Sequence, residues 1–239
     1  LGDVYKRQGL TVEPTASYWD AGEYISTSAK LQVGHPPGAP FFQMMGAVFS
    51  LFASNNESIA IAVNFLSVVS SAFVILFLFW STTLILKKIS KKNNFTNDTN
   101  ILLSSSIGAL AFTFSDSFWF NAVETEVYAL AMLFLSATFW CGLRWEKDFN
   151  NKRGDKWLLL ICFLIGLSFG VHFMAILTIP AIGMIYFFKK YEKITIKNFV
   201  LANIISVSIL LFIFKLLLPS TLSLFLSLIH ISEPTRRYA

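Results

Sequence analysis

Long apolar stretches, separated by short loops rich in lysine and arginine, dominate the sequence. The stretches cover residues 59–86, 101–120, 127–143, 157–188 and 199–218. A helix that spans a membrane needs about 20 apolar residues, and shorter helices are tolerated inside a bundle. The composition, 55% hydrophobic and 14% charged, excludes a disordered chain and disfavours an ordinary soluble domain. We therefore expect an all-α, polytopic transmembrane helix bundle.

Two apolar stretches do not fit a single spanning helix. Residues 157–188 are too many for one helix, and Gly170, His172 and Pro180 predict a break near residues 170–173. Residues 41–53 are too few to span and predict an interfacial or re-entrant helix. The sequence thus predicts about six spans. Residues 9–58 form the first outer loop with its interfacial helices, and residues 59–225 form a truncated transmembrane bundle.

The two ends of the chain are related at the level of DNA. Codons for DVYKRQ, residues 3–8, can be written so that their reverse complement encodes LSLIHI, residues 226–231. Chance rarely produces such a pair, whereas a translated sequencing adapter does; the alternative is a real charged tail. We expect residues 1–8 and 226–239 to be adapter-derived artefacts and the native part to be a fragment open at both ends.

The basic residues predict which side of the membrane each loop occupies. Thirteen of the fifteen lysines and arginines in residues 9–225 lie in the loops that follow the first, third and fifth spans. Such alternate loops lie on one side, which the positive-inside rule makes cytoplasmic. The acidic segments 9–58 and 115–126 then lie together on the outer face.

Asp20 and Glu23 are the strongest candidates for chemistry. A spacing of three residues puts both carboxylates on one face of a helix. Carboxylates beside an apolar membrane surface are costly and usually functional. Desolvation would raise their pKa and a neighbouring cation would lower it. The alternative is an N-capping aspartate followed by an exposed glutamate.

The segment GHPPGAP, residues 34–40, contains three prolines and two glycines. These residues predict a stiff, non-helical turn that aims His35. A helix that starts near Pro40 would offer backbone N–H groups to an anion. The alternative is a rigid connector.

Several further residues on the outer face are candidates. We expect Asp116 to be the most buried acid of its segment, whereas Glu124 and Glu126 are either functional or simply solvated. His172 lies at the predicted outer break, where a lone histidine is more often structural. Lys215 lies near the outer end of the last span and either snorkels or meets a phosphate.

Other classes of site are not indicated. The sequence contains no P-loop, dinucleotide-binding, zinc or serine-hydrolase motif, so it suggests neither a soluble nucleotide nor a nucleic acid as ligand. Cys141 and Cys162 lie in apolar stretches and imply no disulfide framework. Outer-face carboxylates could hold a divalent cation, but no ligand spacing demands one, so no cofactor is predicted with certainty.

Three segments together resemble one family. They are TVEPTASYWDAGEYISTSAKLQVGHPPGAPFF, FSDSFWFNAVETEVYAL and GLSFGVHFMAILTIPAI, and they occur in order within residues 11–190. The chain resembles the bacterial protein O-mannosyltransferase-like membrane proteins, first known as a domain of unknown function and assigned to the GT-C superfamily of glycosyltransferases.

This resemblance implies a function and roles for residues. Such enzymes move a sugar from a polyprenyl-phosphate carrier to an acceptor, a Ser or Thr hydroxyl in protein O-mannosyltransferases, at the outer face of the membrane. Asp20 matches the essential acid of the first outer loop and would be the general base, with Glu23 as its companion. The remaining residues would bind substrate: Lys30, His35 and Lys215 the leaving phosphate, and Asp116, Glu124, Glu126 and His172 the sugar or the acceptor. The implied location is the bacterial inner membrane with the site facing the periplasm.

Two other function classes remain open. A transporter or flippase of lipid-linked sugars also uses membrane carboxylates, but it would place acids at mid-membrane and show repeated halves. A structural membrane anchor would need none of the outer-face acids.

Overall fold

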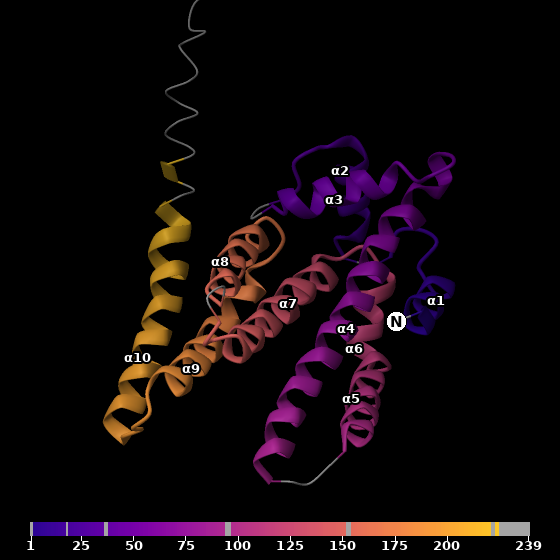
Figure 1. Cartoon of the computed structure of the whole chain (residues 1–239). Coiled ribbons are helices and arrows are strands. Elements are labelled where there is room, and N and C mark those ends of the chain that lie inside the picture. The colour runs from indigo at the N-terminus through magenta and orange to yellow at the C-terminus, as the bar shows by residue number, and fades with distance from the viewer. Residues whose placement is uncertain are drawn as a thin grey trace, which may run out of the picture. The chain divides into compact units, whose positions relative to one another are not determined.

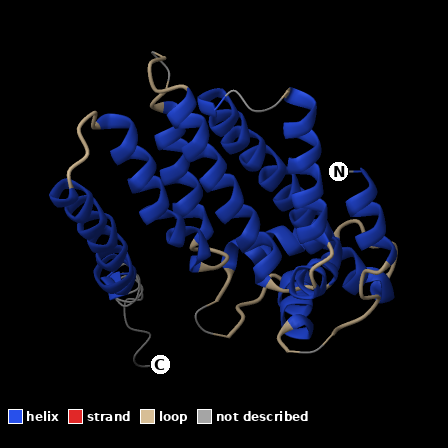
Figure 2. Ribbon diagram, turned by 90° about the horizontal axis from the view of Figure 1, so that it is seen from below, coloured by secondary structure: helices blue, strands red, loops and turns tan. Residues whose placement is uncertain are grey.

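The computed structural model describes residues 2–17, 19–35, 38–93, 97–151, 154–220 and 223–224. Helices make up the regular structure of this described part, and no strand occurs in it (Figure 2). The α-helices are α1 (Gly2–Leu10), α2 (Ala21–Lys30), α3 (Pro40–Ser50), α4 (Ile59–Asn93), α5 (Asp98–Thr113), α6 (Asp116–Val123), α7 (Val127–Lys147), α8 (Lys156–Ser168), α9 (Ile179–Lys190) and α10 (Ile196–Phe212). Two 3-10 helices, η1 (Asn56–Ser58) and η2 (Phe173–Thr178), and one π-helix, η3 (Ile213–Leu217), complete them.

Four helical segments of the described chain are long and apolar enough to cross a membrane. They are Asn56–Lys91, Val127–Lys147, Phe173–Lys190 and Ile196–Ser220, and the bent pair α5–α6 would make a fifth span. The apolar helix α8 is shorter, with 13 residues. The all-α, polytopic prediction is therefore confirmed, with four or five spans and one short helix where about six spans were predicted.

The predicted span 101–120 is not one straight helix. It divides into α5 and α6, which meet at an angle of 69°. Ser115 adopts an extended backbone and precedes Asp116, the first residue of α6. The Ser115 hydroxyl donates to the Phe112 carbonyl oxygen of α5 instead of capping α6. The acid in the first turn suits the helix dipole, so α6 starts at Asp116.

The break predicted near residues 170–173 is confirmed. Helix α8 ends at Ser168 and η2 begins at Phe173. The predicted interfacial helix within residues 41–53 is also present, as α3.

The structure divides into two compact units, and the first extends from residue 1 to residue 178. In this unit α4 packs along α7 and α5, and α2 and α3 pack on each other and on α4 (Figure 1). A core of Phe42, Leu66, Leu130, Phe134 and Ala175 joins α3, α4, α7 and η2. Burying apolar side chains of this size stabilises the fold by about 2 kcal/mol each.

Helices α2 and α3 lie near one end of α4, and the first two basic loops start near its other end. Leu66 and Leu130, near the starts of α4 and α7, share the core below α2 and α3. An ion pair between Lys88 and Glu146 joins the far ends of the same two helices. Because α4 is 35 residues long, these ends are about 50 Å apart. The first two basic loops therefore start at the end of the unit away from α2 and α3.

The second unit, residues 179–239, consists of α9, α10 and η3 in its described part. Helices α9 and α10 pack closely at Gly183, where an added Cβ would lie 2.3 Å from the Ser206 hydroxyl. The predicted adapter-derived segment 226–239 lies outside the described residues. Residues 2–10 form α1, which packs against α4, and the adapter origin of residues 1–8 stays a prediction.

Candidate active site

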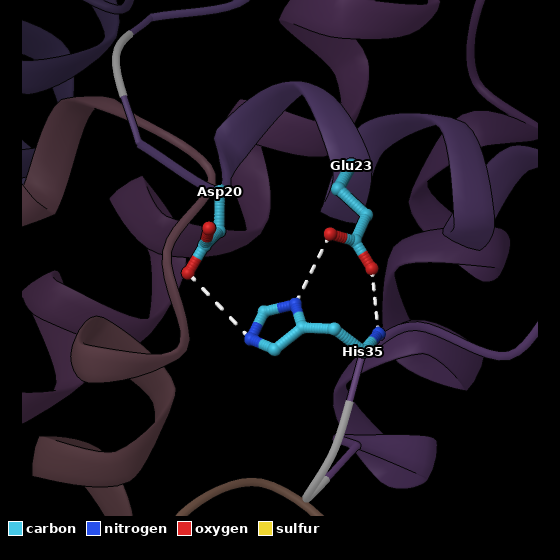
Figure 3. Close-up of side chains that lie close together, drawn as sticks. All are labelled: Asp20, Glu23 and His35. Carbon is cyan, nitrogen blue, oxygen red and sulfur yellow. Dashed lines mark hydrogen bonds and ion pairs between the residues drawn. The ribbon is translucent and has the colours of Figure 1, made fainter.

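Asp20 occupies the N-cap position of α2 without capping it. Its carbonyl oxygen accepts the first helical hydrogen bond, from the Tyr24 N–H at 2.9 Å, but its carboxylate makes no capping bond. The Asp20 side chain is instead 52% exposed and points toward His35 (Figure 3). Of the structural alternative, the N-cap position is present but the side-chain capping bond is not.

Glu23 holds His35 through two contacts. One carboxylate oxygen accepts the backbone N–H of His35 at 2.6 Å, and the other lies 3.0 Å from the His35 Nδ1 atom. The His35 Nε2 atom lies 3.7 Å from the Asp20 carboxylate on the opposite side of the ring. Figure 3 shows the imidazole between the two carboxylates. Asp20 and Glu23 thus share one helix face, as their spacing predicted, and His35 joins them from the following loop.

Glu23 and His35 shift each other's pKa. The hydrogen bonds from His35, first from its backbone and then from its ring, lower the pKa of Glu23. In return, the hydrogen bond to Glu23 raises the pKa of His35, and the charge of Asp20 adds to the effect. The arrangement therefore favours an imidazolium between two carboxylates.

Close packing of α2 on α3 positions this cluster. The Gln43 side chain of α3 donates a hydrogen bond to the Thr27 hydroxyl of α2 at 3.0 Å. A Cβ atom added at Gly46 would lie 2.4 Å from the Ser28 hydroxyl, and one at Gly34 would lie 2.7 Å from Gln43. The two glycines let the helices and the loop before His35 approach closely. Pro36 and Pro37 of the predicted stiff turn lie outside the described residues.

Glu124 and Glu126 are buried, at 3% and 7% exposure, so they are not solvated. Burial raises the pKa of Glu124 and raises that of Glu126 to about 7, where the charge of Asp20 is the second cause. Burial raises the pKa of Tyr24 to about 12, and the negative charges of Glu126, Asp20 and Glu23 contribute to this rise. The second outer segment thus reaches the Asp20 cluster through Glu126.

Asp116 was expected to be the most buried acid of this segment, and that expectation is wrong. Asp116 is exposed at the first turn of α6, whereas Glu124 follows the last residue of that helix. The two acids are separated by the length of α6, about 10 Å. The Ser-Asp helix start, which the sequence pattern did not resolve, exposes Asp116.

The predicted cationic and histidine partners lie at different places. Lys30 is exposed at the opposite end of α2 from Asp20, about 15 Å along the helix axis. His172 packs its ring on Tyr128, with the centroids 5.5 Å apart, and burial lowers the pKa of His172. Lys215 is exposed in η3 of the second unit.

The N-terminus of α3 does not offer the free N–H groups that were expected there. The helix does begin at Pro40, but the N–H groups of Phe41 and Phe42 donate to the carbonyl oxygen of Gly170, at 2.8 and 3.1 Å. A Cβ added at Gly170 would lie 2.7 Å from the Phe41 Cβ atom. The break at residues 170–172 therefore caps α3 and fixes the helix that follows His35.

Two residues near the site escaped the sequence-based prediction. Asn64 is 1% exposed in α4, and its side chain bonds to the segments that contain Glu13 and Thr125. The sequence feature that could have identified Asn64 is a single amide side chain early in an apolar stretch. Trp19, directly before Asp20, is 88% exposed and has a φ of 59°, a left-handed conformation that is rare for an aromatic residue. The sequence gives no sign of that backbone conformation.

The cluster also has atoms of the kind that bind metal ions. One ligand atom each from Asp20, Glu23 and His35 lies within 4.8 Å of the others. In the described structure the imidazole already interacts with both carboxylates, so a cation would have to displace these contacts.

Residues 20–195, which begin at Asp20 itself, match the family described as the protein O-mannosyl-transferase TMEM260 N-terminal domain. The chain belongs to this family. The match covers α2 to the end of α9 and includes the whole Asp20–Glu23–His35 cluster.

Two curated relatives of the TMEM260 family are similar to the chain. The protein O-mannosyl-transferase tmem260 of Dictyostelium discoideum is 26% identical over 221 residues, which cover 86% of this chain and 25% of the relative. The protein O-mannosyl-transferase TMEM260 of Mus musculus is 28% identical over 165 residues, 66% of this chain and 21% of the relative. The chain thus spans about a quarter of the length of these relatives, which are eukaryotic proteins. No solved structure matches the chain.

Proposed function

We propose that the chain is the membrane part of a GT-C type glycosyltransferase. The full-length enzyme transfers a mannose-like sugar from a polyprenyl-phosphate donor to an acceptor hydroxyl, that of a protein Ser or Thr rather than of a glycan. The family and the names of the two relatives support a protein O-mannosyltransferase. One observation carries the proposal. The carboxylate of Asp20 makes no capping bond to α2, is half-exposed, and lies beside His35 at one end of an apolar bundle.

Asp20 is the general base of the proposed reaction. It accepts the proton of the acceptor hydroxyl while the hydroxyl oxygen forms a bond to the anomeric carbon of the sugar. The bond from that carbon to the phosphate oxygen breaks, and the polyprenyl phosphate leaves with the electron pair. A single displacement of this kind inverts the configuration at the anomeric carbon.

His35 stabilises the leaving phosphate. Glu23 orients the imidazole and favours its protonated form. A cation placed where negative charge develops stabilises the transition state more than the ground state. In this proposal Lys30, at the far end of α2 from Asp20, contacts a more distant part of the donor, and the phosphate-binding role of Lys215 stays a prediction.

The remaining candidates bind the sugar or the acceptor. Glu124 and Glu126 are the better placed acids, since Glu126 lies near Asp20. Asp116, at the other end of α6, would reach only an extended acceptor. His172 contributes through its packing on Tyr128.

Protonated His35, rather than a divalent cation, balances the two carboxylates in this mechanism. The imidazole lies 3.0 Å from Glu23 and 3.7 Å from Asp20, so its protonated form places a positive charge beside both carboxylates. The reaction is therefore expected to proceed without an added metal ion.

The proposed location is the outer face of the membrane, the periplasmic face of a bacterial inner membrane. Its support is the charge distribution of the first unit, where the acidic cluster lies at one end of α4 and the basic residues Lys87 and Lys88 at the other. Positively charged loops favour the cytoplasmic side.

The experiment uses a full-length protein that contains this domain, in sealed membrane vesicles with a radiolabelled polyprenyl-phosphate sugar. Label that becomes covalently attached to protein supports the transferase. Label that crosses the bilayer on its unchanged carrier, with none on protein, supports the flippase instead.

A further inference from the structure

Asn64 connects three segments that lie far apart in the sequence. Its amide nitrogen donates hydrogen bonds to the carbonyl oxygens of Glu13, at 2.6 Å, and Thr15, at 3.2 Å. Its amide oxygen accepts a hydrogen bond from the Thr125 hydroxyl. Both N–H groups and the oxygen of one side chain are therefore used, and the side chain joins α4 to residues 13–15 and to residue 125.

This connection is buried and supported by the backbone. Asn64 is 1% exposed and Thr125 is fully buried. The backbone N–H of Glu13 donates to the carbonyl oxygen of Val123 at 2.9 Å, so the same two segments meet a second time. A buried amide costs free energy unless its hydrogen bonds are satisfied, which ties Asn64 to this one arrangement of its neighbours.

Both segments lead to the acidic cluster. Residues 13–15 precede Asp20 by five residues, and Thr125 lies between Glu124 and Glu126. The Glu126 carboxylate is close enough to Asp20 to sense its charge and its backbone N–H. The arrangement of Asp20 relative to Glu126 is therefore anchored, from both sides, on the side chain of Asn64.

We propose that Asn64 and Thr125 form a tether that positions Asp20 and Glu126 relative to each other for sugar transfer. Both are positioning residues, because they act through the segments that they hold and touch no substrate. The proposal rests on the proposed glycosyltransferase function. The loss expected on breaking the tether follows from geometry, since a misplacement of about 1 Å at a reacting group can cost about 100-fold in rate.

The test is a series of substitutions at Thr125 in the full-length protein, assayed with the radiolabelled polyprenyl-phosphate sugar. Thr125→Val keeps the shape of the side chain but removes the donor to Asn64. We expect kcat to fall about 10- to 100-fold while the KM for the donor stays unchanged. Thr125→Ser restores the hydroxyl and should restore most of the turnover, and Thr125→Cys, with its weak S–H donor, should lie between them.

Thr138→Val is the matched control. Thr138 is also a fully buried threonine, but its hydroxyl donates to the Phe134 carbonyl oxygen, at 2.6 Å, within its own helix α7. This variant should keep wild-type turnover per folded molecule. Thermal unfolding and size-exclusion chromatography measure how much of each variant is folded.

The outcomes separate the tether from the function itself. Turnover per folded molecule that is the same in Thr125→Val as in Thr138→Val overturns the tether, as does a lack of order among the Ser, Cys and Val variants. If Thr125→Val does not fold, the order of Ser and Cys decides. Absence of transfer in the wild-type protein would instead contradict the proposed function.

Discussion

Glu126 should make the folded protein less stable as the pH rises. Burial and the charge of Asp20 raise its pKa from 4.5 to about 7 in the folded state. The folded state therefore holds a proton between pH 4.5 and 7 that the unfolded state has released, and stability falls as pH rises through this range. The shift corresponds to about 3 kcal/mol of unfolding free energy, which is present below pH 4.5 and lost above pH 7.

Replacing Glu126 with Gln tests this argument. Glutamine is neutral at every pH and keeps a carbonyl oxygen that can accept the N–H groups of Asp20 and Val127. Glu126→Gln should lose markedly less stability than the wild type between pH 5 and pH 8 in equilibrium unfolding in mixed micelles. Because Glu124 and His172 titrate in both proteins, the difference between the two proteins reports Glu126 together with the effect of its charge on His35.

A matched control and a direct reading complete the experiment. Glu57→Gln makes the same chemical change at an exposed glutamate in η1 and should leave the pH dependence as in the wild type. Infrared spectroscopy should show a carboxylic acid C=O band that disappears near pH 7 in the wild type and is missing from Glu126→Gln. Equal losses of stability in the wild type and in Glu126→Gln would refute the argument from burial.

Three further predictions concern the packing at Gly170, the pairing of Glu23 with His35 and the need for a metal ion. Gly170→Ala should destabilise the fold by about 1–3 kcal/mol in chemical denaturation, since the new Cβ would meet Phe41 at 2.7 Å, whereas Gly108→Ala, with open space around it, should be neutral or stabilising. Glu23→Gln removes the main cause of the raised His35 pKa, so the alkaline decline of sugar transfer should move to lower pH; an unmoved pH–rate profile would contradict the pairing. Washing the enzyme with EDTA should leave transfer intact, and a loss that Mn²⁺ or Mg²⁺ restores would show that a cation, not His35, balances the carboxylates.

Much of the fold could be predicted because membrane spans leave a strong local signal. The apolar stretch from residue 59, the short helix at Pro40 and the break after Ser168 follow from hydropathy, proline and glycine. The bend at Ser115 was missed because a serine and an aspartate in a mainly apolar stretch weigh little in hydropathy. The aspartate nevertheless suits the first turn of a new helix, which begins at Asp116.

The site was predictable where it depended on spacing along one helix. Asp20 and Glu23 share a face of α2 because they are three residues apart. The burial of Glu124 and Glu126, and the bonds from Asn64 to Glu13 and Thr125, depend on contacts between segments about 50 to 110 residues apart. No local pattern contains such contacts, so the acids were ranked in the wrong order of burial.

The central claim is that the Asp20 carboxylate takes the proton of the acceptor hydroxyl. The most direct measurement compares the wild type with Asp20→Asn in the full-length protein, by the rate at which labelled sugar passes from polyprenyl phosphate to protein. Removing a general base costs about 100- to 10,000-fold, so Asp20→Asn should show almost no transfer while it folds and inserts like the wild type. Transfer by Asp20→Asn within a few-fold of the wild-type rate would contradict the claim.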